Sequence, residues 1–195
     1  RVEALELRVK GQRGKDALAL DLDWPQLDVA GTKLAGSPLK GRLALGGELP
    51  IDASFKSGAP SGSFEAIALP GFEATLKSSG SGRALDGTLR ADLGLQPAKS
   101  ALSLAALVVD AKLQDKQLKP LALAVRGSAH ASPEAAKWSL AGSLNANSFA
   151  LDGSANLSAQ PVFVKANGKF DSLDLNTLLP EAASAGTEPG SGKPA

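Results

Sequence analysis

The sequence predicts an all-β, mainly antiparallel protein, folded as a curved, elongated sheet or groove of about ten strands with a short helical or irregular C-terminal segment. Two observations carry this prediction. Apolar and polar residues alternate with period two along most of the chain, which is typical of strands with one apolar face. In addition, a phrase of apolar, polar, glycine, polar and apolar residues recurs, for example at 39–43, 85–89 and 140–144.

The N-terminal third divides into alternating runs at Leu5 to Val9 and Leu18 to Trp24. Pro25 is expected to end the second run, because proline has no backbone N–H for a strand ladder. A short strand then follows at Leu27 to Val29. Residues 39–55 read as one long or bulged strand, interrupted by glycines and a proline.

The central and C-terminal parts continue the pattern. Residues 64–76 predict a hairpin that turns at Pro70-Gly71, and residues 85–95 alternate over their whole length. Residues 102–113 fit either a short helix or a strand, and we favour the strand. Further alternating runs lie between 121 and 170.

The last part of the sequence differs in composition. Residues 173–179 carry leucines near helical spacing, and everything after Pro180 is rich in alanine, serine, glycine, proline and glutamate. We therefore predict one β-repeat domain over residues 1–180 and a disordered tail over 181–195. Because the chain begins at Arg1 without methionine or a signal-like segment, we expect it to be part of a longer protein.

Composition limits both the core and the partners. Hydrophobic residues make up 43% but aromatic residues only 4%, so small aliphatic side chains must fill the interior. Such side chains favour a thin or curved sheet over a thick sandwich. The 21 basic and 20 acidic residues give a net charge of +1 without a basic stripe, which argues against a nucleic-acid partner.

The search for chemistry predicts no catalytic residue, no cofactor and no metal. His130 is the one histidine, and no Gly-x-Ser-x-Gly elbow accompanies it. The pairs Asp21/Asp23 and Asp171/Asp174 lack the glycine and distal glutamate of a calcium loop. We therefore expect a protein that is not an enzyme.

Glycines inside the strands, such as Gly87, Gly142 and Gly153, allow two interpretations. They either mark bulges that curl the sheet or keep its apolar face shallow, so that an apolar ligand can lie along it. A leucine- and alanine-rich face must also be covered by a second sheet, by helices or by a ligand. Since helix-forming sequence is scarce, a closed sandwich and an apolar ligand groove both remain open.

Two C-terminal stretches carry a resemblance. Residues 151–158, Leu-Asp-Gly-Ser-Ala-Asn-Leu-Ser, precede residues 162–180, which end in Phe-Asp-Ser-Leu-Asp-Leu-Asn-Thr-Leu-Leu-Pro. Together they resemble the carboxy-terminal region of the AsmA family of bacterial envelope proteins, where Gly-containing strands lead into a phrase like Phe-Asp-x-Leu-Asp-Leu-x-x-Leu-Leu-Pro.

The resemblance implies a largely periplasmic, non-enzymatic protein, anchored to the inner membrane through a segment of its parent chain that is absent here. It also implies an elongated β groove, related to TamB and the bridge-like lipid-transfer proteins, that serves phospholipid transport or outer-membrane assembly. Other parts of the parent chain and other envelope proteins would be its partners.

Our hypothesis is that the groove shields phospholipid acyl chains on its apolar face. The alternative is a structural or interaction module that scaffolds outer-membrane assembly without bound lipid. The candidate groove residues are apolar strand-interior positions: Leu20, Leu43, Leu89, Leu123, Leu144 and Val164.

Overall fold

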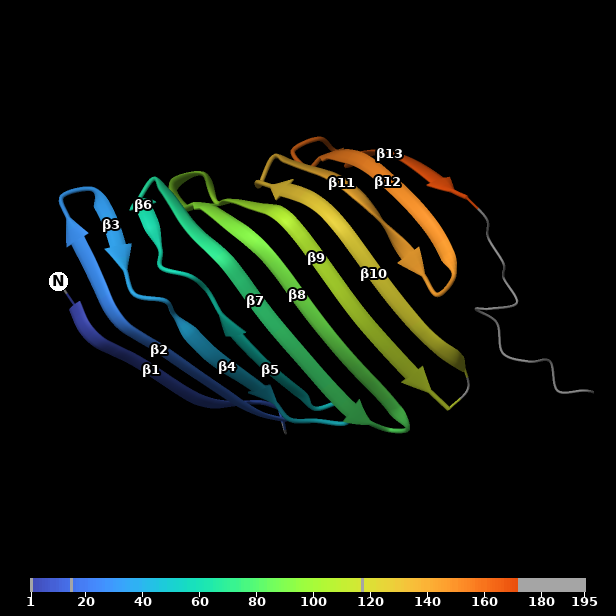
Figure 1. The fold of residues 1–195 in the computed structure, drawn as a ribbon, viewed down its shortest axis with the longest axis horizontal. Helices are drawn as coiled ribbons and strands as arrows, with labels where there is room; N and C mark the ends of the chain where they lie inside the picture. The colour runs from blue at the N-terminus through green and yellow to red at the C-terminus, as the bar shows by residue number, and fades with distance from the viewer. Residues whose placement is uncertain (1, 15, 117, 172–195) are drawn as a thin grey trace, which may run out of the picture.

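The computed structural model describes residues 2–14, 16–116 and 118–171, and nearly all of this backbone is antiparallel strand (Figure 1). One sheet contains all thirteen strands, and a single 3-10 turn, η1 (Pro97–Lys99), connects two of them. The strands are β1 (Val2–Arg13), β2 (Asp16–Ala30), β3 (Lys33–Gly36), β4 (Lys40–Leu45), β5 (Ile51–Lys56), β6 (Ser61–Ser63), β7 (Ala66–Gly80), β8 (Arg83–Gln96), β9 (Ala101–Asp115), β10 (Leu118–Ala131), β11 (Ala135–Leu144), β12 (Asn147–Asn156) and β13 (Phe163–Phe170).

The sheet is a meander in which neighbours in the sequence are neighbours in space. Between β2 and β7, however, each position is divided between two short strands. β3 and β4 both pair with β2, and β5 and β6 both pair with β7. The thirteen strands therefore fill eleven positions, from β1 at one edge to β13 at the other.

The expected all-β, antiparallel fold is confirmed, but several strand boundaries differ from the prediction. Residues 39–55 form the hairpin β4–β5 and not one long strand, while residues 66–80 form the single strand β7 and not a hairpin at Pro70-Gly71. The strand preference for 102–113 is correct, since these residues lie in β9. The predicted segment 173–179 and the predicted tail 181–195 lie outside the described residues.

Irregularities of the strands line up across the sheet and form one bend line. The line runs through residues 37–39, which separate β3 from β4, and residues 57–60, which separate β5 from β6. It also passes through the register shift at Pro70-Gly71 in β7 and the shifts near Ala91 in β8 and Ala106 in β9. It continues into β10, where the register shifts again between Gly127 and Ala129. Because extra residues bend a strand locally, an aligned set of them bends the whole sheet.

Pro25 lies on the same bend line, which explains why it does not end β2. Its neighbours Trp24 and Gln26 pair with Leu5 and Glu3 of β1, while the position opposite Pro25 is taken by Ala4 in a left-handed conformation, with φ of 54°. The missing N–H of proline therefore falls where the ladder is already interrupted.

Side-chain and backbone hydrogen bonds close the gaps that the bend opens. The Ser37 N–H donates to the Gln26 carbonyl over 2.9 Å, and the Gln26 N–H donates to Ser37 Oγ over 2.9 Å. The indole of Trp24 donates to the Ser37 carbonyl at 3.1 Å. Further along, the Gly71 N–H donates to Asp92 Oδ1 at 2.8 Å. The polar groups freed by the bend are thus paired.

The sheet is one layer thick over the described residues, with neither a second sheet nor an α-helix against it. Few apolar residues of this part are buried: Leu34, Pro60, Ala91, Ala101, Leu107 and Ala155. Sandwich closure, which the sequence left open, therefore does not occur within these residues. In the same part, no helix has the length and apolarity needed to cross a bilayer.

Candidate functional site: the apolar concave face

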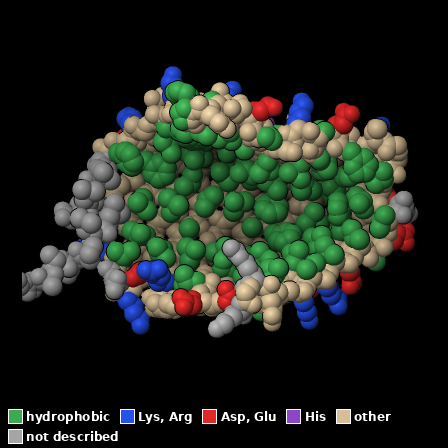
Figure 2. All heavy atoms as spheres, turned by 180° about the vertical axis from the view of Figure 1, so that it is seen from behind, with side chains coloured by type: hydrophobic (Ala, Val, Ile, Leu, Met, Phe, Trp, Pro, Cys, Tyr) green, Lys and Arg blue, Asp and Glu red, His purple; other side chains and the backbone are tan. Residues whose placement is uncertain are grey.

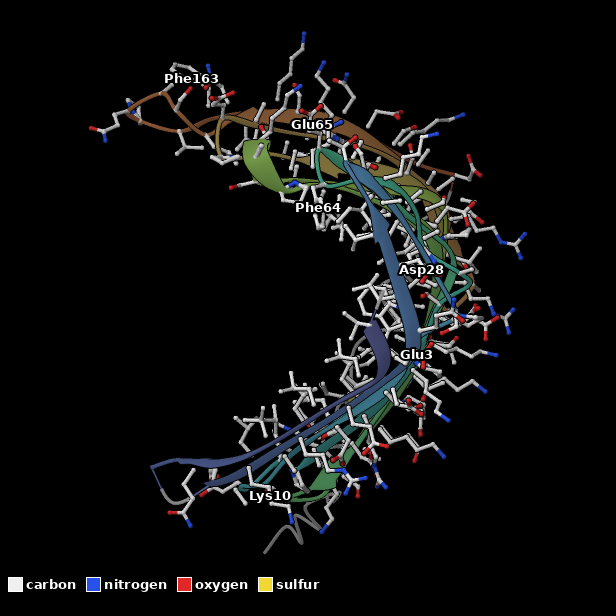
Figure 3. All side chains as sticks on the ribbon, turned by 90° about the vertical axis from the view of Figure 1, so that its left-hand side faces the viewer. Glu3, Lys10, Asp28, Phe64, Glu65 and Phe163 are labelled. Atoms are coloured by element: carbon white, nitrogen blue, oxygen red, sulfur yellow. The ribbon has the colours of Figure 1, made fainter. Side chains whose placement is uncertain are left out.

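The bend gives the sheet a C-shaped cross-section, and the strands curve along the C (Figure 3). Phe64 points to the inside of the C, whereas its neighbour Glu65 points outward (Figure 3). Seen from behind, the hollow is lined by hydrophobic side chains and the charged groups lie around its margin (Figure 2). The alternation in the sequence has therefore placed its apolar residues on the concave face.

Cross-strand register resolves the concave face into rows that run along the groove. Four of the six predicted residues, Leu20, Leu43, Leu123 and Leu144, belong to one of them, which we call the lower row. Its members are directly paired from strand to strand: Val9, Leu20, Leu43, Ala53, Leu76, Gly87, Ala111, Leu123 and Leu144.

Leu89 and Val164 lie on the same face in two other rows. The middle row crosses all eleven strand positions and comprises Leu7, Leu22, Gly41, Phe55, Ala74, Leu89, Val109, Val125, Gly142, Phe149 and Phe170. The upper row, beyond the bend line, comprises Val29, Leu34, Gly62, Ile67, Leu95, Leu102, Ala131, Ala136, Ala155 and Val164. Every member of the three rows is apolar or glycine.

Glycines on this face have two structural roles. Gly41 and Gly153 lie beneath the aromatic rings of their cross-strand partners Phe55 and Trp138, which occupy the space of a β-carbon. Gly87 instead leaves open space, since a β-carbon there would meet only Ala111 Cβ and the Asp110 carbonyl oxygen, both at 3.9 Å. The first role fits large rings into the sheet, and the second keeps the floor of the groove shallow, so glycines of the latter kind agree with the ligand interpretation.

The six predicted lining residues are not fully buried, although Leu34 and Ala155 of the upper row are. Leu20, Leu43, Leu89, Leu123 and Leu144 are all intermediate in exposure. Val164, on the edge strand, is 63% exposed. Figure 2 shows a contiguous hydrophobic lining across the hollow, and large contiguous apolar surfaces mark interaction sites.

The groove is long in comparison with a lipid chain. Eleven strand positions separated by about 4.8 Å span roughly 50 Å. One leaflet of hydrocarbon is about 15 Å thick, half of the ~30 Å bilayer core. The concave face therefore has room for roughly three acyl chains laid end to end.

The convex face carries most of the charges, and several of them form ion pairs. Lys40 Nζ lies 3.0 Å from Asp23 Oδ2, and Glu73 lies between Lys56 at 3.0 Å and Arg90 at 3.6 Å. The hydrogen bond from Lys56 and the nearby positive charges lower the pKa of Glu73. The Lys40–Asp23 and Lys56–Glu73 pairs line a hollow of about 760 Å³. Its lining carries five basic and four acidic side chains, so little net charge is available to hold an ionic ligand.

The remaining candidates from the sequence do not assemble into a site. His130 is exposed on the convex face, and its side chain makes no hydrogen bond or ion pair with the described residues. Asp21 and Asp23 also lie on this face, and Asp23 is paired with Lys40. No cluster of three metal-ligating side chains occurs in the described part of the chain. Asp174 lies outside it.

Sequence reasoning missed most of the aromatic lining. Phe55, Phe149 and Phe170 belong to the middle row, and the rings of Phe149 and Phe170 are 6.2 Å apart. The available signal was their phase within the strand, since Phe149 and Phe170 lie at even spacings from Gly153 and Gly168, and Phe55 shares the phase of the apolar residues of its own strand. The phase of a residue does not identify the strand that pairs with its own, so the rows could not be predicted from the sequence.

A single-layer antiparallel sheet with a continuous apolar concave face defines the chain as a β-groove protein. Comparison with protein-family models, with curated proteins and with solved structures found no match to this chain.

Proposed function

We propose that this chain is a non-enzymatic β-groove segment that shields phospholipid acyl chains during lipid transport and outer-membrane assembly. The observation that carries the proposal is the set of three apolar rows on an uncovered concave face. The resemblance of residues 151–180 to the AsmA family supports the same function, and with it a periplasmic location and an inner-membrane anchor in the parent protein.

Binding would rest on burial of hydrocarbon. Each methylene removed from water contributes about 0.8 kcal/mol, so a chain lying along several leucines needs no specific contact. The three rows hold no charge and no hydrogen-bonding side chain, which suits an acyl chain and leaves the polar headgroup outside, in water.

Occupancy of the groove by lipid is tested by native mass spectrometry of the chain purified from a bacterial periplasm, followed by lipid extraction. We expect co-purified phospholipid, and we expect Leu89→Asp/Leu123→Asp to lose it. The matched control is Thr88→Asp/Ala122→Asp, which places two carboxylates on the convex face of the same two strands. Lipid retained by the concave variant, with its fold intact by circular dichroism, would refute the proposal.

The structural alternative makes a different prediction for the same experiment. In the described residues, β1 and β13 each pair with one neighbour only, so both edges of the sheet can accept a further strand. A module that scaffolds envelope proteins through these edges would be recovered as folded protein of bare polypeptide mass. That result would favour scaffolding over lipid shielding.

A further inference from the structure

The loop between β12 and β13 exposes large apolar side chains at one end of the groove. We call it the hairpin tip and define it by Leu157, Val162 and Phe163, which are 41%, 54% and 68% exposed. Phe163 has the highest exposure among the exposed large hydrophobic residues of the described chain. It lies at the free end of the upper arm of the C, away from the concave floor (Figure 3).

Two unpaired cations lie next to the hairpin tip. Register places Lys137, Ser154 and Lys165 side by side on the convex face, two residues along the strands from Phe163. Neither lysine forms an ion pair with any of the described residues, in contrast to the paired charges around Glu73. Apolar side chains beside free lysines are the combination that favours the interface of an anionic bilayer.

We propose that the hairpin tip inserts into the surface of an anionic lipid bilayer and docks this end of the groove on the membrane. Val164, the residue after Phe163, belongs to the upper row of the concave face. An inserted tip therefore brings the apolar lining of the groove to the edge of the bilayer hydrocarbon. Vesicle binding itself requires no lipid in the groove, so the inference goes beyond the proposed function.

The same charges argue against a second copy of the chain as the occupant. A two-fold contact through the hairpin tip would bring Lys137 and Lys165 of one copy close to the same residues of the other. Glu134, whose backbone carbonyl accepts from the Leu157 N–H, is the acidic residue beside these two lysines, so the net charge of the tip stays positive. Like net charges oppose association, whereas phosphate headgroups are attracted. A bilayer also accommodates a narrow loop, because the apolar side chains enter hydrocarbon while the lysines stay among the headgroups.

Vesicle flotation of the full chain tests the proposal. We expect the chain to float with phosphatidylcholine vesicles containing phosphatidylglycerol and more weakly with phosphatidylcholine alone. Val162→Ser/Phe163→Ser should weaken binding about tenfold or more. Leu49→Ser/Leu118→Ser is the matched control, because these residues are 43% and 42% exposed at the opposite rim. Lys137→Gln/Lys165→Gln should remove the preference for the anionic lipid.

A site-specific probe distinguishes insertion from loose adsorption. The chain has no cysteine, so Val162→Cys can carry a single polarity-sensitive fluorophore, with Leu118→Cys as the control. Vesicles should shift the emission of the dye at 162 to the blue and leave that at 118 unchanged. Absence of flotation, equal binding by Val162→Ser/Phe163→Ser, or an unchanged dye at 162 would overturn the proposal. Self-association that this variant abolishes, without vesicle binding, would identify a protein interface instead.

The outcome is separable from that of the proposed function. Leu89→Asp/Leu123→Asp, which should lose groove lipid, keeps the hairpin tip and is expected to float as the unaltered chain does. Conversely, Val162→Ser/Phe163→Ser should still take up lipid supplied in detergent micelles, because Leu89, Leu123 and their rows are unchanged.

Discussion

The indole ring of Trp138 on β11 lies over the α-carbon of Gly153, its direct partner on β12. A β-carbon at 153 would overlap with the Cζ2 and Cε2 atoms of the indole. The glycine therefore creates the space in which a large aromatic side chain lies flat on the sheet, and the ring covers backbone that glycine leaves bare.

Gly153→Ala should accordingly destabilise the fold by about 1–3 kcal/mol, because the new methyl group displaces the Trp138 ring. Gly168→Ala is the control on the next strand, where the nearest atom to a β-carbon is Leu151 Cδ1 at 3.8 Å. It should change stability by less than about 0.5 kcal/mol. Urea denaturation measures both. In a Trp138→Leu background the cost of Gly153→Ala should vanish, and a cost that persists would contradict the assigned contact.

The bend line gives a second prediction at Ala106, which has φ of 49°. A left-handed conformation costs an L residue about 1–2 kcal/mol, and a β-branched residue more. We expect Ala106→Gly to raise the free energy of unfolding and Ala106→Val to lower it by about 2 kcal/mol.

Ala111→Val, on the same strand, is the control, since its side chain faces the open space at Gly87 and strands favour valine. If valine at 106 and valine at 111 changed the free energy of unfolding equally, the bend would not require a left-handed conformation at residue 106. The free energy of unfolding of each variant comes from urea titration.

A hydrogen bond between two strands stabilises the bend line further. The Gly71 N–H, in the irregular part of β7, donates to Asp92 Oδ1 of β8 at 2.8 Å. Asp92→Ala should lose about 1 kcal/mol of stability, because the N–H loses a charged acceptor. Asp86→Ala removes an exposed carboxylate from the same face of β8 and should be close to neutral. If the two substitutions cost the same, the hydrogen bond has no role in the bend.

Period-two alternation was enough to predict the all-β fold and the residues that share a face. Leu85 to Leu95 shows why, since a strand with one apolar face needs no information from its neighbours. Pro25 and Pro70-Gly71 misled the prediction because both are turn signals locally. In the structure β2 continues past Pro25 and β7 continues past Pro70-Gly71, because the adjacent strands are irregular at the same level. This alignment depends on the register between strands, which the sequence of a single strand does not reveal.

The candidate site was predictable to a similar extent. Leu20 and Leu123 are far apart in the sequence, yet their phase placed both on the apolar face. That they lie in one row, with Leu43 and Leu144, depends on the pairing of every intervening strand. The hairpin tip at Phe163 was also hidden, because exposure of an apolar residue in a strand is set by what covers it.

The convex face predicts a dependence of stability on pH. Lys56, and then Arg90, lower the pKa of Glu73 from its ordinary value of 4.5. Folding therefore favours the ionised carboxylate: the resulting stability is complete above pH 4.5 and is lost as the pH falls through the lower, folded-state pKa. Glu73→Gln should flatten the acid side of the stability curve, and high salt should reduce the difference.

The matched control for Glu73 is Glu65→Gln. Glu65 is an exposed carboxylate of the β6–β7 turn that forms no ion pair with the described residues. Urea midpoints measured from neutral pH to well below 4.5 provide the comparison. An acid limb that Glu73→Gln and Glu65→Gln leave equally unchanged would mean that the Lys56 pair does not persist in solution.

Gly87 allows the depth of the groove to be changed without unfolding the protein. It lies in the lower row between Leu76 and Ala111, and a β-carbon there meets nothing closer than 3.9 Å. Gly87→Leu should therefore keep the free energy of unfolding within about 1 kcal/mol, since an interior strand glycine is itself unfavourable. The new side chain raises the floor where the lining is shallowest, so we expect it to reduce bound phospholipid. Thr88→Leu adds the same side chain to the convex face and should leave the lipid content unchanged. Urea denaturation and lipid extraction of both variants distinguish a lipid groove from a scaffold. A scaffold that binds no lipid would show the same lipid content for Gly87→Leu and Thr88→Leu.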